Sequence, residues 1–165
     1  MTYEPWQPGM KLSANRLLSI SPTWSSWTPT WSTTTGANTP SFGNATLDCA
    51  YAVSATTVWW RMDIVFGSTT NFGGGSAADN WQFTLPVTAA SAVNAAGAVE
   101  LSFSGNARVV ARSRLLSTTQ MGLEISSGKP DGTAVANSGL VDLLSPFTWA
   151  SGNSIRGVGH YEAAA

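Results

Sequence analysis

Alternation between apolar and polar side chains over residues 57–66 constrains this chain more than any other feature. The positions on one face of an extended chain would be Val58, Trp60, Met62, Ile64 and Phe66, and those on the other Trp59, Arg61, Asp63 and Val65. A period of two residues is typical of a β-strand with one buried face. A loop rich in Gly, Ser, Thr and Asn follows, and the alternation resumes over residues 81–85 until Pro86 ends it. The sequence therefore predicts a long hairpin over residues 58–86 with an exposed tip at residues 68–80.

The same pattern recurs along most of the chain. Further strands are predicted over residues 47–53, 99–112, 121–125, 140–144 and 154–161, with a bulge or bend at Gly105. Trp27, Pro29 and Trp31 also alternate, and Pro29 favours an edge strand because proline cannot donate a ladder hydrogen bond. The Ala-rich residues 87–98 are predicted as a loop. About eight short strands joined by turns predict an all-β fold, a jelly-roll-like β-sandwich of antiparallel strands.

Composition favours an exposed β-protein over a charge-rich helical enzyme. Charged residues make up 10% of the 165 residues, whereas a typical soluble domain has about 25%. Ser and Thr together take up about a quarter of the chain, and eight residues are Trp. The net charge of −1 provides no basic field for a phosphate backbone, so no nucleic-acid partner is expected.

The first 24 residues differ from the rest and are predicted to be an attachment arm, followed by the β-sandwich domain over residues 25–165. Ser13 could cap one short helical turn, which is too short to be stable alone and would order only by docking. The candidate docking residues of the arm are Trp6, Pro8, Leu12, Leu17 and Leu18. The segment has no apolar core of signal-peptide length, and no run of the chain approaches a membrane span, so no membrane partner is expected.

Residues that could carry chemistry are sparse. His160 is the only histidine and is predicted to be an exposed strand residue, and neither a transition-metal site nor a serine-hydrolase elbow is indicated. No pair of carboxylates stands in a recognisable catalytic setting, although a glycosidase pair opposed across a cleft stays a minor alternative. Cys49 is the only cysteine and is predicted to be a buried, inert thiol. The sequence therefore predicts a protein that is not an enzyme and needs no cofactor or metal.

Two features could still bind a ligand. The Gly-rich tip lacks the Gly-Lys-Ser/Thr ending of a phosphate loop and the spacing of a calcium loop, so it is predicted to be a simple exposed loop. Its candidate contact residues are Thr69, Asn71, Phe72 and Asn80. Trp24, Trp31 and Trp59 could form a platform for sugar rings, but burial of Trp59 against a second sheet or a neighbouring subunit is the favoured interpretation.

Three sets of residues together resemble a known group of proteins. They are residues 27–31 (WTPTW) with 43–47 (GNATL), residues 66–73 (FGSTTNFG) with 81–86 (WQFTLP), and residues 146–152 (PFTWASG). In this order they are similar to small β-rich virion proteins, minor tail or fibre-like, of tailed phages and prophages of actinobacteria.

This resemblance implies a structural protein on the surface of the virion, made in the host cytoplasm, with its own copies and other virion proteins as partners. A trimeric tail fibre or minor tail protein is the expected role, and a capsid decoration protein and a carbohydrate-binding module are the alternatives. A host cell-surface glycan is a further candidate partner. In a trimer, the outward residues Trp59, Val65 and Val110 would be the candidate subunit interface.

Overall fold

The structure is a computed structural model that describes residues 9–11, 13, 21–74, 79–93, 95–104, 107–125 and 139–165. The arm residues predicted to dock, which are Trp6, Pro8, Leu12, Leu17 and Leu18, lie outside the described residues. The prediction of an attachment arm therefore stays a prediction.

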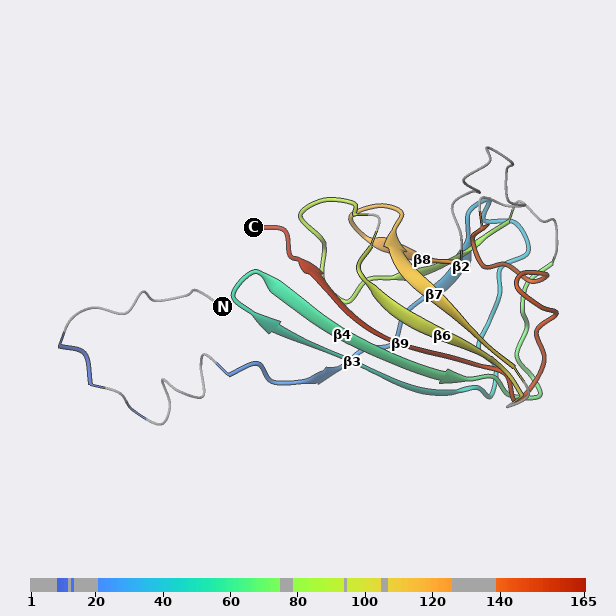
Figure 1. The fold of residues 1–165 in the computed structure, drawn as a ribbon, viewed down its shortest axis with the longest axis horizontal. Helices are drawn as coiled ribbons and strands as arrows, with labels where there is room; N and C mark the ends of the chain where they lie inside the picture. Colours follow the sequence, from blue (N-terminus) through green and yellow to red (C-terminus); the bar gives the residue numbers. More distant parts are fainter. Residues whose placement is uncertain are drawn as a thin grey trace.

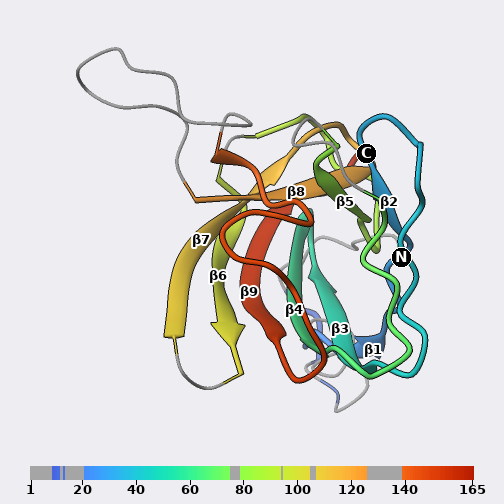
Figure 2. The same ribbon diagram turned by 90° about the vertical axis from the view of Figure 1, so that its right-hand side faces the viewer.

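The described residues form nine strands joined into one antiparallel sheet, in the spatial order β1-β3-β4-β9-β6-β7-β8-β5-β2 (Figure 1). The strands are β1 (Ser25–Ser26), β2 (Trp31–Thr33), β3 (Thr46–Ser54), β4 (Thr57–Val65), β5 (Trp81–Thr84), β6 (Gly97–Phe103), β7 (Ala107–Leu115), β8 (Gln120–Glu124) and β9 (Ser154–Glu162). Strands β3, β4, β9, β6 and β7 lie side by side as one long layer, and β8, β5 and β2 curl over one end of it (Figures 1 and 2). The all-β, antiparallel prediction is confirmed. The jelly-roll sandwich is not, because the described strands belong to one continuous curled sheet.

A single run of nine residues, 25–33, connects the two edges of this sheet. Its first part, β1, pairs with β3 at one edge, and its last part, β2, pairs with β5 at the other. Between them, the Trp27 amide donates to the Cys49 carbonyl (2.9 Å) and the Thr84 amide donates to the Thr30 carbonyl (3.0 Å). Pro29 lies buried in this crossing, where its missing N–H costs no ladder bond. Pro29 itself lies in no strand, so the single predicted edge strand is instead two short edge strands, β1 before it and β2 after it.

The core fills the inside of the curl. Strand β4 alternates as predicted, with Val58, Trp60, Met62 and Ile64 buried. At the end of the core, Trp31 packs against Trp81 with ring centroids 4.6 Å apart, and Phe42, Phe66, Phe72 and Phe83 surround the same indole at 5.2 to 6.2 Å. Aromatic rings bury large areas and add favourable edge and stacking geometries. The strand that closes the sheet is thus anchored by the most aromatic part of the core.

The predicted hairpin over residues 58–86 is wrong. Strand β4 pairs with β3 and β9, whereas β5 pairs with β8 and β2. The chain after β4 crosses to the other end of the sheet instead of turning back on its own strand. Alternation specifies which face of a strand is buried, not which strand is its neighbour, so the sequence pattern of a hairpin and that of a crossover were the same here.

Two further predictions need correction. Residues 99–112 are not one bent strand but parts of β6 and β7, which form a hairpin; Gly105 lies outside the described residues. The turn could not be recognised in the sequence, because odd-numbered residues face the same side of the sheet both before and after it. Residues 140–144 form no strand: Leu140 makes only an isolated bridge with Glu124, and Asp142 turns the chain by accepting hydrogen bonds from the amides of Leu144 and Ser145.

Candidate interaction surface

The outer face of the long layer is the side of β3, β4, β9, β6 and β7 that points away from the core. The register aligns Asp48, Asp63, Arg156, Glu100 and Val110 in one row across the five strands. The next row contains Arg61, Val158, Ala98 and Arg112. Charged and apolar side chains therefore share one hydrogen-bonded surface, with the charged residues concentrated in the first row.

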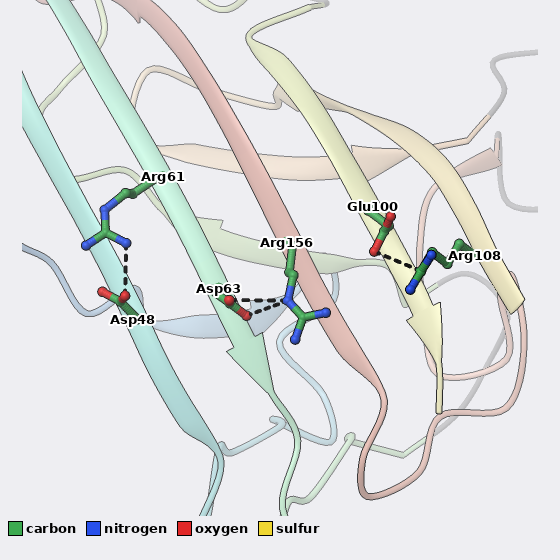
Figure 3. A network of polar contacts seen from close by, with 6 residues as sticks. All are labelled: Asp48, Arg61, Asp63, Glu100, Arg108 and Arg156. Carbon is green, nitrogen blue, oxygen red and sulfur yellow. Dashed lines mark hydrogen bonds and ion pairs between the residues drawn. The ribbon is translucent and has the colours of Figure 1, made fainter. Parts of the chain in front are cut away.

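Among the described residues, three ion pairs cross this face (Figure 3). Arg61 Nη1 lies 2.9 Å from Asp48 Oδ2, Arg156 Nε lies 3.0 Å from Asp63 Oδ1, and Arg108 Nε lies 3.5 Å from Glu100 Oε1. The hydrogen bond from Arg61 to Asp48 raises the pKa of the Arg61 guanidinium. Because each pair is well exposed, water screens it and it contributes little to stability. Their main effect is that opposite charges on this face neutralise one another.

The most exposed large apolar side chains of the outer face are Val110, 75% exposed, and Val158, 64% exposed. Together they line a shallow depression whose other walls are Ala98, Val99, Glu100, Arg156 and Gly157. We call Val110, Val158 and Ala98 the aliphatic depression. Exposed apolar side chains that gather around one hollow are typical of an interaction site, whereas scattered ones need no explanation.

The part of the same face that borders Val158 is aromatic, because His160 lies two residues beyond Val158 along β9 and pairs with Trp59 on β4. Trp24 is 51% exposed and Trp59 is 44% exposed. The His160 ring lies 5.1 Å from the Trp59 ring, and the Arg61 guanidinium lies 6.0 Å from the Trp24 ring. We call Trp24, Trp59 and His160 the aromatic cluster.

The predicted interface residues lie on one face but not in one patch. Trp59 and Val110 are exposed and Val65 is half-buried. Arg61 and Asp63 stand between Trp59 and Val65 along β4, and β9 and β6 separate β4 from Val110 on β7. Val158, which the structure places beside Ala98 and Arg61, was not among the predicted interface residues. The sequence around it indicates only a single apolar residue between Gly157 and Gly159.

The other predicted ligand-binding residues are dispersed. Of the three tryptophans of the sugar platform, Trp31 is buried in the core, and only Trp24 and Trp59 reach the surface. Of the predicted tip, Thr69 and Asn71 are exposed and Asn80 is half-buried. Phe72 is half-buried against Phe66 and Trp81, because this segment is a crossover that packs on the core.

Titratable side chains inside the protein have structural partners. Cys49 is buried as predicted, and loss of solvent raises the pKa of its thiol to about 11. The buried Glu124 carboxylate is held by Arg112, whose Nε and Nη2 lie 2.7 and 2.6 Å from Oε2. Within the described ranges, no group of three or more His, Cys, Asp or Glu side chains is placed to hold a metal ion.

Comparison with protein-family models, with curated proteins and with solved structures found no significant match to this chain. The part of the chain that the structure describes contains no helix long and apolar enough to cross a membrane.

Proposed function

We propose that this chain is a structural protein on the surface of a tailed-phage virion, a trimeric tail-fibre or minor tail protein held by residues 1–24. The observation that carries the proposal is the aliphatic depression: Val110 and Val158 protrude beside a hollow on an otherwise well-formed sheet. Contact between copies of the chain would remove these side chains from water, and apolar area removed from water contributes about 25 cal/mol per Å².

The ion pairs around the depression favour a defined arrangement of copies. Glu100 and Arg156 line its rim, and Asp63 and Arg108 are their partners. Charges at the rim of an interface contribute to orientation and specificity more than to affinity. Around a threefold axis, the same pair of surfaces would meet at each of the three contacts between copies.

A structural role is supported over hydrolysis by the state of the buried carboxylates. The Glu124 carboxylate accepts a hydrogen bond from the Arg112 side chain. The Asp142 carboxylate accepts hydrogen bonds from the backbone amides of Leu144 and Ser145. The Asp79 carboxylate accepts hydrogen bonds from the amide and the hydroxyl of Thr35. A catalytic acid needs a carboxyl group that can reach substrate. Each of these three instead stabilises a turn or a strand pair.

The phage assignment rests on the resemblance of residues 27–31, 43–47, 66–73, 81–86 and 146–152 to minor tail and fibre-like proteins. A capsid decoration protein is the competing form of the same proposal, because it also combines an arm with a compact β-domain.

The test is to locate the protein on intact particles with a specific antibody and electron microscopy. The proposal expects label on the tail, whereas label on the shell supports the decoration form. Particles that carry none of the protein would contradict both.

A matched variant lacking residues 1–20 should keep the circular dichroism of the full chain yet fail to attach, and attachment of this variant would refute the role of the arm.

A further inference from the structure

We propose that the aromatic cluster on the outer face is a binding site for a neutral oligosaccharide. This goes beyond the proposed structural role and does not depend on it, because the site is complete within one chain. The observation behind it is that two tryptophans, both about half exposed, lie on the outer face with polar groups beside them. Trp24 comes immediately before β1 and Trp59 lies on β4, with β3 between these two strands.

The register places the two indoles on one line across the strands. Ser25 pairs with Tyr51, so Trp24 comes next to Ala52, and Ala52 pairs with Trp59, which in turn pairs with His160. Trp24 and Trp59 are thus separated by about two strand spacings, roughly 10 Å between their backbones. Ala52, which lies between them on β3, is only 2% exposed.

The side chains around the indoles hold them in place. The Arg61 guanidinium is fixed by Asp48 at 2.9 Å and lies 6.0 Å from the Trp24 ring, and the His160 ring contacts Trp59 at 5.1 Å. A site whose aromatic groups are already ordered loses less conformational entropy when a ligand binds.

The chemistry of the cluster fits a saccharide. A pyranose ring has an apolar C–H face that packs on an indole and a rim of hydroxyl groups that need hydrogen-bond partners. Trp24 and Trp59 offer two apolar faces, while Arg61, Asp48 and His160 offer donors and acceptors beside them. An extended chain of sugars could place one ring on each indole.

The charge of the surface argues for a neutral ligand. Arg61, the charged residue that contacts Trp24, is paired with Asp48, so the charges beside the cluster are already compensated within the chain. An anionic or cationic partner would have to compete with this pair. A second copy of the chain is the competing occupant of the cluster, and the oligomeric mass of Trp59→Ser distinguishes it from a saccharide.

The experiment is a titration of the full-length protein with two neutral probes, the tetramer of N-acetylglucosamine and maltotetraose, and with the anionic tetramer of galacturonic acid. Binding is measured by calorimetry and by tryptophan fluorescence. The proposal expects binding of at least one neutral tetramer, weaker binding of the anionic one, and loss of about tenfold or more in affinity for Trp59→Ser and for Trp24→Ser.

Two matched variants complete the design. Trp59→Phe keeps a flat apolar ring and should retain most of the affinity, whereas Val110→Ser alters the same face far from the cluster and should leave binding unchanged. Circular dichroism checks that each variant is folded. The proposal is wrong if neither neutral tetramer binds at millimolar concentration, if binding survives both tryptophan substitutions, if only the anionic tetramer binds, or if Trp59→Ser changes the oligomeric mass without any saccharide binding.

Discussion

At the scale of single residues, Cys49 shows how burial controls reactivity. Its side chain is 5% exposed, and removal from solvent raises the pKa of the thiol to about 11. Only the thiolate is a strong nucleophile, so at neutral pH very little of the reactive form is present.

We therefore expect Cys49 to resist a thiol-specific reagent in the native protein at pH 8. The same reagent should label one thiol per chain promptly in concentrated urea, which is the control. Labelling is followed by absorbance or mass spectrometry. Stoichiometric labelling of the native protein within minutes would show that the thiol is accessible, contrary to the structure.

The buried carboxyl group of Asp79 leads to a prediction about how the stability of the fold changes in acid. Burial acts to raise the pKa of this carboxyl, but hydrogen bonds from Thr35 and Thr33 outweigh it, and the net pKa is below the ordinary 3.8. A carboxyl with a lowered pKa in the folded state stabilises the fold above the ordinary pKa, and this stabilisation is lost as pH falls through the folded value. Asp79→Ala removes the acceptor for the amide and hydroxyl of Thr35, at 2.9 and 2.6 Å.

Asp79→Ala should lower the free energy of unfolding by about 1–3 kcal/mol at pH 7. The difference from the wild type should shrink as the pH is lowered from about 5 toward about 2, because the wild-type carboxyl becomes protonated. Urea unfolding over this pH series measures it, and Asp79→Asn, which keeps an acceptor, is the matched variant. A difference that stays constant or grows in acid would contradict the assignment.

At the scale of elements, β2 closes the curled sheet, and Trp31 anchors it among five aromatic rings. Trp31→Ala would leave a cavity at this junction. We expect a loss of about 3–5 kcal/mol in the free energy of unfolding, measured by urea denaturation. Trp59→Ser removes an indole of equal size from the surface and should cost far less. Equal losses for the two variants would mean that Trp31 does not anchor the closure.

The same elements show what the sequence could and could not predict. Strands β3, β4, β5, β8 and β9 were predicted within one or two residues of their observed ends, because burial of one face leaves a period of two in the sequence. Which strands pair with one another produces no comparable pattern in the sequence. The pattern around β4 and β5 was therefore interpreted as a hairpin, although the two strands lie in different parts of the sheet.

For the candidate surface too, the sequence indicated which face a residue occupies but not which residues lie close together. Alternation correctly placed Trp59 and Val110 on the outer face, but the separation between them depends on strand order. Val158 was missed because its inward neighbours are Gly157 and Gly159, which break the apolar pattern. The structure explains these glycines: a Cβ on Gly157 would lie 2.8 Å from Val99 Cγ2, and one on Gly159 would clash with the Ala96 carbonyl.

At the scale of the whole molecule, the chain combines a tightly packed aromatic interior with an outer face of low net charge. Charged pairs on that face compensate one another, so little electrostatic repulsion opposes contact between copies. The exposed Val110 and Val158 would provide the apolar contact. The proposed structural role depends on self-association through the aliphatic depression.

The most direct test is the mass of the full chain in solution by light scattering, compared with that of the double variant Val110→Lys, Val158→Lys. Both positions are exposed, so the lysines should not disturb the monomer. We expect three times the chain mass of 17.2 kDa for the wild type and a single chain mass for the variant. A wild type that stays monomeric at all concentrations, or a variant that keeps the wild-type mass, would contradict the proposal.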